Sequence, residues 1–375
     1  MTSSLLFSSY ALPSPAGGLV LPNRIVIAPM CQYAATNGQA TDWHQYHWTN
    51  LLNSGAGLLI LEATAVEPQG RISPGCLGLW DDATEAALTD RLQRARALAP
   101  AMPVCMQISH AGRKASSAAP WHGGALLPAE QGGWPTFGPS ALPHLPHETP
   151  PAALTPDDLD RIEAAFVNTA KRAARAGIDA LEIHAAHGYL LHQFLSPLAN
   201  QRTDGWGGDY AGRTAFPKRV LRAVRGVFDG PVGVRLSATD WVEGGWTLSE
   251  SEQLSIEMKA LGANFVHVSS AGVSPLQKIP VGPLYQVDLA QAVRQASQLP
   301  TMAVGLITTA AQAEAVLQQG QADLVALARA FLYDPRWAWH AAAELGASVP
   351  AQTPYWRCAP ASAGALFQNA RIGMR

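Results

Sequence analysis

The chain has 375 residues, of which 14% are charged, and its formal net charge is -2. This balance gives no basic surface for nucleic acid or anionic lipid, so small, neutral partners are expected. Four cysteines without a CxxC pair favour a reducing compartment and argue against disulfides and structural zinc, and no apolar stretch reaches the roughly 18 residues of a spanning helix. We therefore expect a soluble, cytoplasmic protein that holds no metal and contacts neither membrane nor nucleic acid.

Short apolar runs, many of them β-branched, recur along the chain and alternate with helix-like segments. One such segment, 155–176, begins with a plausible cap and repeats apolar residues at helical spacing. Buried parallel strands read as continuous apolar runs, and eight strand–helix units close a barrel. We expect a single α/β domain over residues 1–375, a (β/α)8 TIM barrel. Its predicted strands are 24–28, 57–62, 103–109, 180–184, 232–236, 265–269, 301–304 and 324–327.

The segment 111–150 interrupts this alternation, because it is rich in Gly, Pro, Trp and Ser and shows no sustained period. A long irregular segment inside a compact domain is usually functional or disordered. It follows the third strand, so barrel geometry places it over the mouth of the barrel. We expect it to form a lid that caps the site.

Residues at the carboxyl ends of barrel strands build the active site in this fold. Small and polar residues concentrate at these positions, which favours an enzyme. They are Pro29, Met30 and Cys31 after the first strand, Ala65 after the second, Gln107 on the third, 184–189 after the fourth, Arg235 on the fifth, Ser269 and Ser270 after the sixth, Gly305 after the seventh, and Ala328 and Arg329 after the eighth.

His184, His187 and Tyr189 fall within six residues where the fourth strand turns into its loop. Two neutral imidazole N–H groups can hold a carbonyl or nitro oxygen and stabilise the negative charge that develops there. A phenol stays protonated at neutral pH, so Tyr189 suits a general acid. A metal-binding histidine pair and histidines satisfied within the barrel wall stay open as alternatives, although no third metal ligand is evident.

Arg235 closes an apolar strand, where a guanidinium is costly unless it has a partner. A reduced flavin would supply the anion, and an ion pair with Asp240 or Glu243 is the alternative. Gln107 can donate and accept at once, which suits the pyrimidine edge of a flavin, but it could merely link barrel layers.

The loops after strands seven and eight are frequent phosphate sites in barrels. Gly305 allows close approach of the backbone, and free N–H groups attract a phosphate where Ala328 and Arg329 enter the next helix. The sequence has no Walker loop and no well-placed GxGxxG, so a Rossmann dinucleotide site is not supported.

Seven ordered motifs cover nearly the whole chain: RIVIAPMCQY, LLILEATAVEPQGRI, QISHAGRK, GIDALEIHAAHGYLLHQFLSPLANQRTDGWGG, GVRLSATD, AVGLI and ADLVALARAFLYDP. They resemble the Old Yellow Enzyme family of FMN-dependent ene-reductases, specifically its bacterial thermophilic-like NADPH dehydrogenases and xenobiotic reductases. The resemblance implies non-covalent, tightly bound FMN and hydride from NADPH or NADH. It also implies ping-pong reduction of activated C=C bonds in α,β-unsaturated carbonyls, maleimides or nitro compounds.

The resemblance further implies roles for single residues. His184 and His187 hold the activating oxygen of the substrate, Tyr189 donates the proton, and Tyr33 and Lys114 line the pocket. In a homodimer or homotetramer, Arg357 reaches into the neighbouring active site. Cys31 lies beside the flavin and tunes its potential, with a purely structural cysteine as the alternative. The implied FMN set is Ala28, Pro29, Met30, Cys31, Ala65, Gln107, Arg235, Ala328 and Arg329.

Two features depart from the family pattern. Ala328 stands where the family commonly has Gly before the last arginine, and the tail 358–375 runs past the usual end. We expect this tail to be disordered or to pack on a partner. Two other functions stay open: a phosphate-binding barrel lyase or aldolase with Lys114 as a desolvated Schiff base, and a flavin-binding protein without catalysis.

Overall fold

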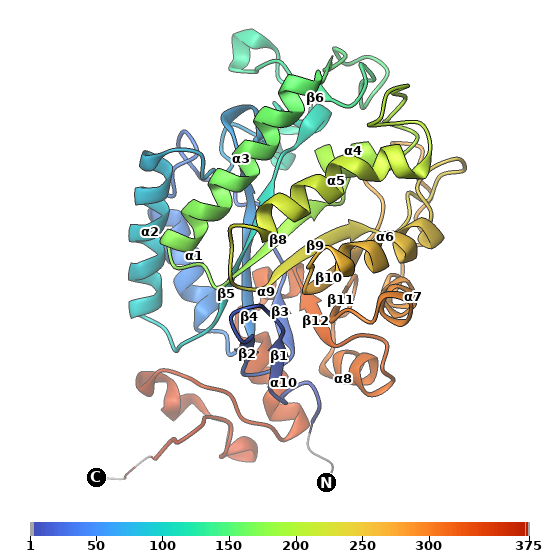
Figure 1. Cartoon of the computed structure of the whole chain (residues 1–375). Helices are drawn as coiled ribbons and strands as arrows, with labels where there is room; N and C mark the ends of the chain where they lie inside the picture. The colour runs from blue at the N-terminus through green and yellow to red at the C-terminus, as the bar shows by residue number, and fades with distance from the viewer. Residues whose placement is uncertain (1–3, 372, 374–375) are drawn as a thin grey trace.

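A closed barrel of parallel strands forms the centre of the protein in the computed structural model, which describes residues 4–371 and 373 (Figure 1). Consecutive barrel strands pair around the ring, and β12 closes on β3 with Leu327 opposite Ile27. Each strand overlaps one of the predicted runs, so the (β/α)8 prediction is confirmed. The barrel strands are β3 (Ile25–Ile27), β4 (Leu58–Ala65), β5 (Val104–Ser109), β8 (Ala180–Ala185), β9 (Val232–Ser237), β10 (Phe265–Ser269), β11 (Thr301–Val304) and β12 (Leu324–Leu327).

Helices surround the barrel and cover its outer face (Figure 1). The helix expected over 155–176 runs from Pro156 to Arg175, and its N-cap, Thr155, accepts a hydrogen bond from the Asp158 amide. Across the described part of the chain, the α-helices are α1 (Asp42–Leu52), α2 (Asp82–Ala97), α3 (Pro156–Arg175), α4 (Leu190–Leu195), α5 (Tyr210–Arg225), α6 (Leu248–Ala260), α7 (Val287–Ser297), α8 (Ala310–Gln318), α9 (Arg329–Tyr333) and α10 (Trp337–Leu345). None of them is both long enough and apolar enough to cross a membrane.

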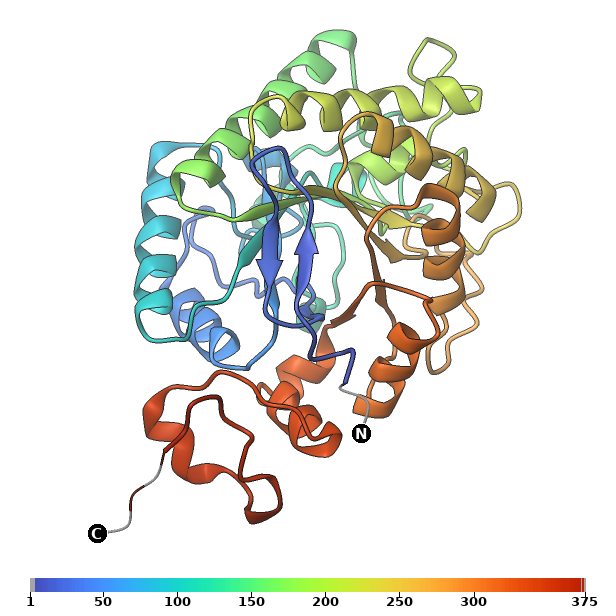
Figure 2. The same cartoon turned by 60° about the horizontal axis from the view of Figure 1, so that its bottom comes forward.

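A hairpin of β1 (Tyr10–Leu12) and β2 (Leu19–Leu21) closes the amino-terminal end of the barrel, as Figure 2 shows. Leu12 and Leu21 are fully buried in a cluster with the lowest layer of barrel side chains, which includes Phe265. The hairpin seals this end with apolar contacts. A ligand therefore enters from the other end, where the strands terminate.

The segment 111–150 lies at the top of the molecule in Figure 1, at the end opposite the hairpin. It contains three short 3-10 turns and the strand β6 (Phe137–Gly138), which pairs with β7 (Ala152–Ala153). The guanidinium of Arg113 donates to the carbonyl oxygens of Leu142 and Val273 and so ties the segment to the loop after β10. The ring of Trp121 packs edge-on against Tyr33, with 5.3 Å between ring centroids. The segment thus lies over the carboxyl ends of the strands, and its movement as a lid stays a prediction.

The C-terminal tail folds back on its own chain. Leu366 and Phe367 are buried against Trp339 of α10 and Val349. The Val349 amide donates to the Leu366 carbonyl, and the Gln368 amide donates to the Val349 carbonyl. The tail is therefore not disordered at residues 366–368, because its apolar side chains pack on the same chain, and its packing on a partner stays a prediction. Positions 372, 374 and 375 lie outside the described residues.

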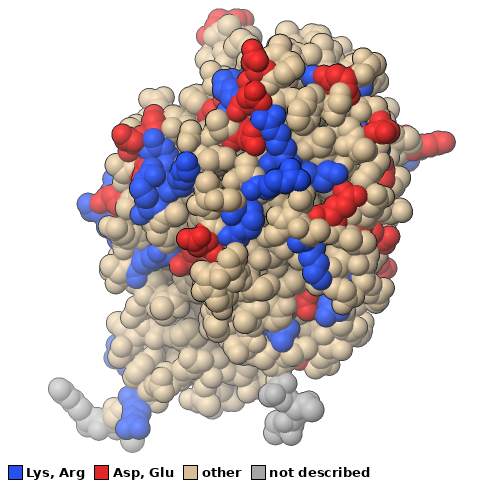
Figure 3. All heavy atoms as spheres, viewed as in Figure 1, with Lys and Arg blue, Asp and Glu red and all other residues tan. Residues whose placement is uncertain are grey.

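Charged side chains of both signs are interspersed on the face seen in Figure 3. Many are paired: Arg219 of α5 contacts Asp160 and Glu163 of α3, and Arg172 of α3 contacts Glu85 of α2. No large field of one sign covers this face, as the small net charge predicts.

Candidate active site

Three barrel strands place polar side chains side by side inside the upper barrel. His184 on β8 is opposite Arg235 on β9, and Arg235 is opposite His267 on β10. All three side chains are buried. Side chains that point to the same face alternate along a strand, so the same strands keep apolar residues such as Ile183 and Val234 on the other face, toward the helices.

The two predicted histidines contact each other and a serine. His184 Nε2 lies 3.3 Å from His187 Nδ1, and His187 Nε2 lies 2.8 Å from Ser269 Oγ. Burial, reinforced by the positive charge of Arg235, lowers the pKa of both rings well below the ordinary value. Both imidazoles are therefore neutral at pH 7, as an N–H donor pair requires.

The turn that carries His187 is held in an uncommon backbone conformation. His187 and Gly188 both have positive φ, and a Cβ on Gly188 would lie 2.1 Å from the carbonyl oxygen of Gly272. The Gly188 amide donates to His192 Nδ1, and His192 Nε2 contacts a carboxylate oxygen of Asp240 at 2.8 Å. This buried pair fixes the turn, and with it the position of the donor groups.

Tyr189 lies against His184, with 4.9 Å between ring centroids in an edge-to-face arrangement. Burial raises the pKa of Tyr189 well above its ordinary value, so the phenol remains protonated. Tyr33 and Cys31 pack on the same small apolar cluster as Tyr189. The adjacent Cys76 thiol, together with burial, raises the pKa of Cys31 and keeps it a neutral thiol. The structure thus brings together four residues that the sequence predicts for one pocket.

A buried polar network lies beneath this pocket. Gln107 Nε2 donates to Glu182 Oε1 at 2.6 Å, and Glu182 Oε2 contacts His267 Nδ1 at 2.7 Å. Burial opposes ionisation of Glu182, but the neighbouring His267 and Arg235 charges outweigh it and lower the pKa of Glu182. Gln107 therefore links β5 to β8, which agrees with the structural alternative predicted for it, and its role at a flavin stays a prediction.

Arg235 has no hydrogen bond or ion pair with any described residue, although only 7% of its surface is exposed. The expected alternative partner Asp240 instead contacts His192, accepts from Ser196 Oγ and accepts from the Trp246 amide. Glu243 is exposed and does not pair with Arg235 either. The alternative of a protein ion pair is therefore wrong, because the loop carboxylate nearest in sequence is occupied elsewhere.

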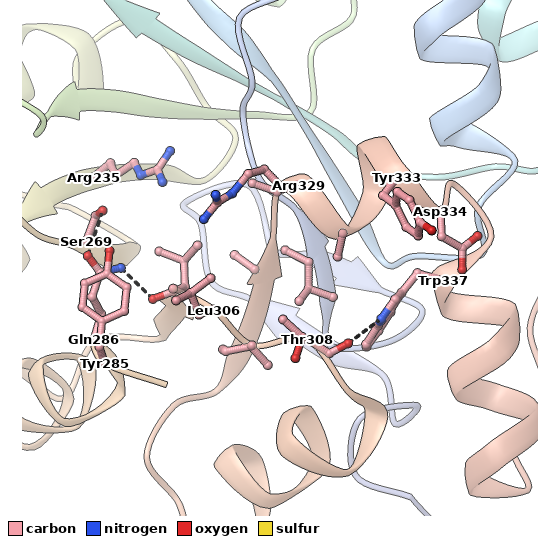
Figure 4. Close-up of a pocket in the computed structure, with 17 residues that line it drawn as sticks. Arg235, Ser269, Tyr285, Gln286, Leu306, Thr308, Arg329, Tyr333, Asp334 and Trp337 are labelled. Atoms are coloured by element: carbon pink, nitrogen blue, oxygen red, sulfur yellow. Dashed lines mark hydrogen bonds between the residues drawn. The ribbon is translucent and has the colours of Figure 1, made fainter. Parts of the chain in front are cut away.

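A cavity of about 650 Å³ opens beside Arg235 at the ends of β10, β11 and β12 (Figure 4). Arg329 points toward Arg235 across it. Gly305 has a φ of +122°, and a Cβ at this position would lie 2.6 Å from Gln286 Nε2. Glycine is therefore required there. Four predicted cofactor residues line this one cavity: Arg235, Gly305, Ala328 and Arg329.

The remaining predicted cofactor residues lie at the ends of the first two barrel strands. Ala28 and Met30 line a narrow space with Trp48 and Glu62. Ala65 ends β4 opposite Ser109 of β5. Pro29 lies between Ala28 and Met30, directly after β3.

Lys114 and Arg357 differ from the other predicted residues. Lys114 Nζ donates to the carbonyl oxygens of His187 and Gly272 and lies 5.2 Å from the centre of the Tyr189 ring. Burial and the neighbouring Arg113 charge lower the pKa of Lys114 to about 8. Arg357 is exposed on a 3-10 turn, Thr353–Cys358, and does not line the cavity of its own chain.

Sequence reasoning did not select Glu182, His267 or Gln286 and did not assign Ser269 a contact. Glu182 and His267 carry a detectable signal, since each is a polar residue inside an otherwise apolar strand, ALEIHA and FVHVS. Their pairing joins positions 85 residues apart, which no local pattern reveals.

Known proteins resemble this chain in sequence and in fold. Residues 13–347 match the family described as NADH:flavin oxidoreductase / NADH oxidase. An NADPH dehydrogenase of Geobacillus thermodenitrificans is 41% identical over 357 residues, which cover 95% of this chain and 98% of that protein. An NADPH dehydrogenase of Listeria innocua is also 41% identical and covers 94% of this chain and 99% of its own. The solved structure of morphinone reductase matches with a TM-score of 0.75 at 27% identity and covers 99% of each chain.

Proposed function

The chain belongs to the Old Yellow Enzyme family, the NADH:flavin oxidoreductase / NADH oxidase family, and from this premise we propose that it is an FMN-dependent ene-reductase. It would reduce activated C=C bonds of α,β-unsaturated carbonyls, maleimides or nitro compounds, with NADPH or NADH as the hydride donor. The observation that carries the proposal is the placement of two neutral histidines and a protonated tyrosine beside a buried arginine that has no partner among the residues the structure describes.

The residues present fit FMN. Arg235 has a buried Nε without an acceptor, which suits the negative edge of a flavin ring. Arg329 and the backbone at Gly305 and Ala328 line the far part of the same cavity, where a phosphate would be held. A cavity of about 650 Å³ is within the usual range for a cofactor site. Bound FMN would take hydride from the nicotinamide and deliver it to the β-carbon of the alkene.

The protein's own residues would orient the substrate and move one proton. The imidazoles of His184 and His187 donate to the activating oxygen and stabilise the charge that develops on it. The Tyr189 phenol, kept neutral by burial, gives its proton to the α-carbon. Tyr33 and the indole of Trp121, which pack together, would cover the substrate from the side of the 111–150 segment.

The contacts of Lys114 favour an ene-reductase over a lyase that would use this lysine to form a Schiff base. Its ammonium donates to two backbone carbonyls and so joins the His187 turn to the loop after β10. A Schiff-base lysine must instead present a free amine to a substrate carbonyl. A flavin-binding protein without catalysis would not need the ordered histidine pair and tyrosine.

We also propose that the protein is a homodimer or homotetramer, in which Arg357 contributes to the neighbouring active site.

Tyr189→Phe tests the proton donor, because it removes only the phenolic hydroxyl. We expect reduction of the bound flavin by NADPH to stay within about twofold, while alkene reduction slows at least about 100-fold, the usual contribution of a general acid. Rapid-mixing absorbance measurements of the two half-reactions separate these rates. Tyr210→Phe on α5 loses the same hydroxyl away from the site and should change neither rate. Equal slowing of both half-reactions would remove Tyr189 from this role.

A further inference from the structure

Ser269, the last residue of β10, is the polar partner of His187. Its Oγ lies 2.8 Å from His187 Nε2, and the serine is 5% exposed. Which ring nitrogen of a histidine carries the proton is set by the hydrogen bond that the other nitrogen makes. Ser269 is therefore in a position to decide the tautomer of one member of the histidine pair.

The hydrogen bonds fix where the protons lie in the structure without substrate. His184 Nδ1 accepts from the Ala186 amide, so the proton of this neutral ring is on Nε2. That Nε2–H donates to His187 Nδ1, which places the proton of His187 on its own Nε2, donating to Ser269 Oγ. Each N–H group of the pair is thus used within the protein. In this arrangement, His187 offers no donor to an oxygen placed between the two rings.

Within the described part of the chain, the hydroxyl proton of Ser269 has no other strong acceptor. Its contact with Gln286 Oε1 is long, at 3.5 Å, and Ser270 Oγ already donates to the same oxygen at 2.6 Å. Gln286 is held in place by its Nε2, which donates to the Val304 carbonyl. Ser269 can therefore turn its proton toward His187 without leaving Gln286 unsatisfied.

We propose that Ser269 is a positioning residue that switches His187 from the Nε2–H to the Nδ1–H tautomer when a substrate oxygen enters between the histidines. In the switched state Ser269 donates to His187 Nε2, and His187 Nδ1–H and His184 Nε2–H both face the oxygen. One proton leaves Nε2 to water and one arrives at Nδ1 from water, so the net charge is unchanged. The inference rests on the proposed function, since it assumes that this pair holds the activating oxygen.

The tautomer is read directly from the ¹⁵N shifts of the histidine rings in the FMN-loaded protein, with His187→Gln used to assign the His187 signals. The probe is 4-cyanophenolate, a planar oxyanion without a reducible C=C bond. In the wild-type protein we expect the His187 proton on Nε2 without the probe and on Nδ1 at saturation. A proton that stays on Nε2 at saturation would overturn the proposal, and the shifts that decide this are those of the wild-type protein.

Ser269→Ala should weaken 4-cyanophenolate binding about tenfold, the loss expected for one hydrogen bond in a network that holds a charged group. Ser269→Thr keeps the hydroxyl and should restore most of the affinity. Ser255→Ala removes a buried hydroxyl from α6 and serves as the matched control. Unchanged affinity in Ser269→Ala would also overturn the proposal. A protein that shows the tautomer switch but reduces no alkene would contradict the proposed function alone.

Discussion

The surroundings of Arg235 leave its buried guanidinium without a direct acceptor among residues 4–371 and 373, so this residue requires an added anion. A guanidinium carries five N–H donors, and a buried donor without an acceptor costs about 1–3 kcal/mol. Burial lowers the pKa of Arg235, while the Glu182 carboxylate opposes this change through space. Glu182 itself is hydrogen-bonded to Gln107 and His267, so it offers charge to Arg235 but no direct hydrogen bond. A ligand oxygen or nitrogen in the cavity would satisfy the remaining donors.

Arg235→Met should therefore weaken FMN binding at least tenfold, since hydrogen bonds to charged groups contribute about 1.5–3 kcal/mol. Quenching of FMN fluorescence, titrated into flavin-free protein, measures the affinity. The matched control is Arg219→Met, which removes a guanidinium that pairs with Asp160 and Glu163 on the outer helices. If both variants bind FMN as the wild-type protein does, Arg235 does not contact the flavin.

At the scale of single elements, the strands were predictable because a buried parallel strand is apolar along its whole length. The predicted second strand ends at Glu62, three residues before the end of β4. In the structure Glu62 is buried, lies 3.4 Å from His44 and accepts from the Gln32 amide, so the strand continues to Ala65. Contacts such as His187 with Ser269, which are 82 residues apart, could not be predicted, because they depend on how the barrel closes.

A further prediction concerns a single element, the C-terminal 3-10 turn Thr353–Cys358, which carries Arg357. Arg357 is exposed there, and the tail that follows docks through Phe367 on Trp339. If Arg357 acts in the neighbouring active site, Arg357→Ala and Tyr189→Phe variants are each defective but complement each other. After subunit exchange of equal amounts, about a quarter of all sites should be complete in a dimer, because half of the dimers are mixed and each has one intact site. Enone-dependent NADPH oxidation measures the recovery. Absence of recovery, with exchange verified by mass spectrometry, would place Arg357 outside the site.

For the whole molecule, the buried histidines link stability to pH. The pKa values of His184 and His187 lie well below 6.5 in the folded protein. Below about pH 6.5 these two histidines therefore bind more protons in the unfolded chain than in the folded protein. The free energy of unfolding, which is unaffected by the two rings above this pH, decreases as the pH falls below it. Each ring should contribute up to about 1.4 kcal/mol per pH unit.

Urea unfolding between about pH 7 and pH 5, at a fixed FMN concentration, measures this dependence. We expect the free energy of unfolding to fall with pH in the wild-type protein and to fall less steeply in a His184→Asn, His187→Asn double variant. The other buried histidines and carboxylates are the same in both proteins, so they cancel in the comparison. Identical slopes would show that the two rings are not held neutral by the fold.

The central claim is that the barrel couples NADPH to alkene reduction through a bound flavin. An anaerobic visible spectrum of the purified protein, recorded before and after NADPH and then after 2-cyclohexenone, tests it most directly. The account predicts an oxidised flavin spectrum that bleaches with NADPH and returns when the enone is added. A colourless protein that takes up no added FMN, or a reduced flavin that no enone, maleimide or nitroalkene reoxidises, would contradict it.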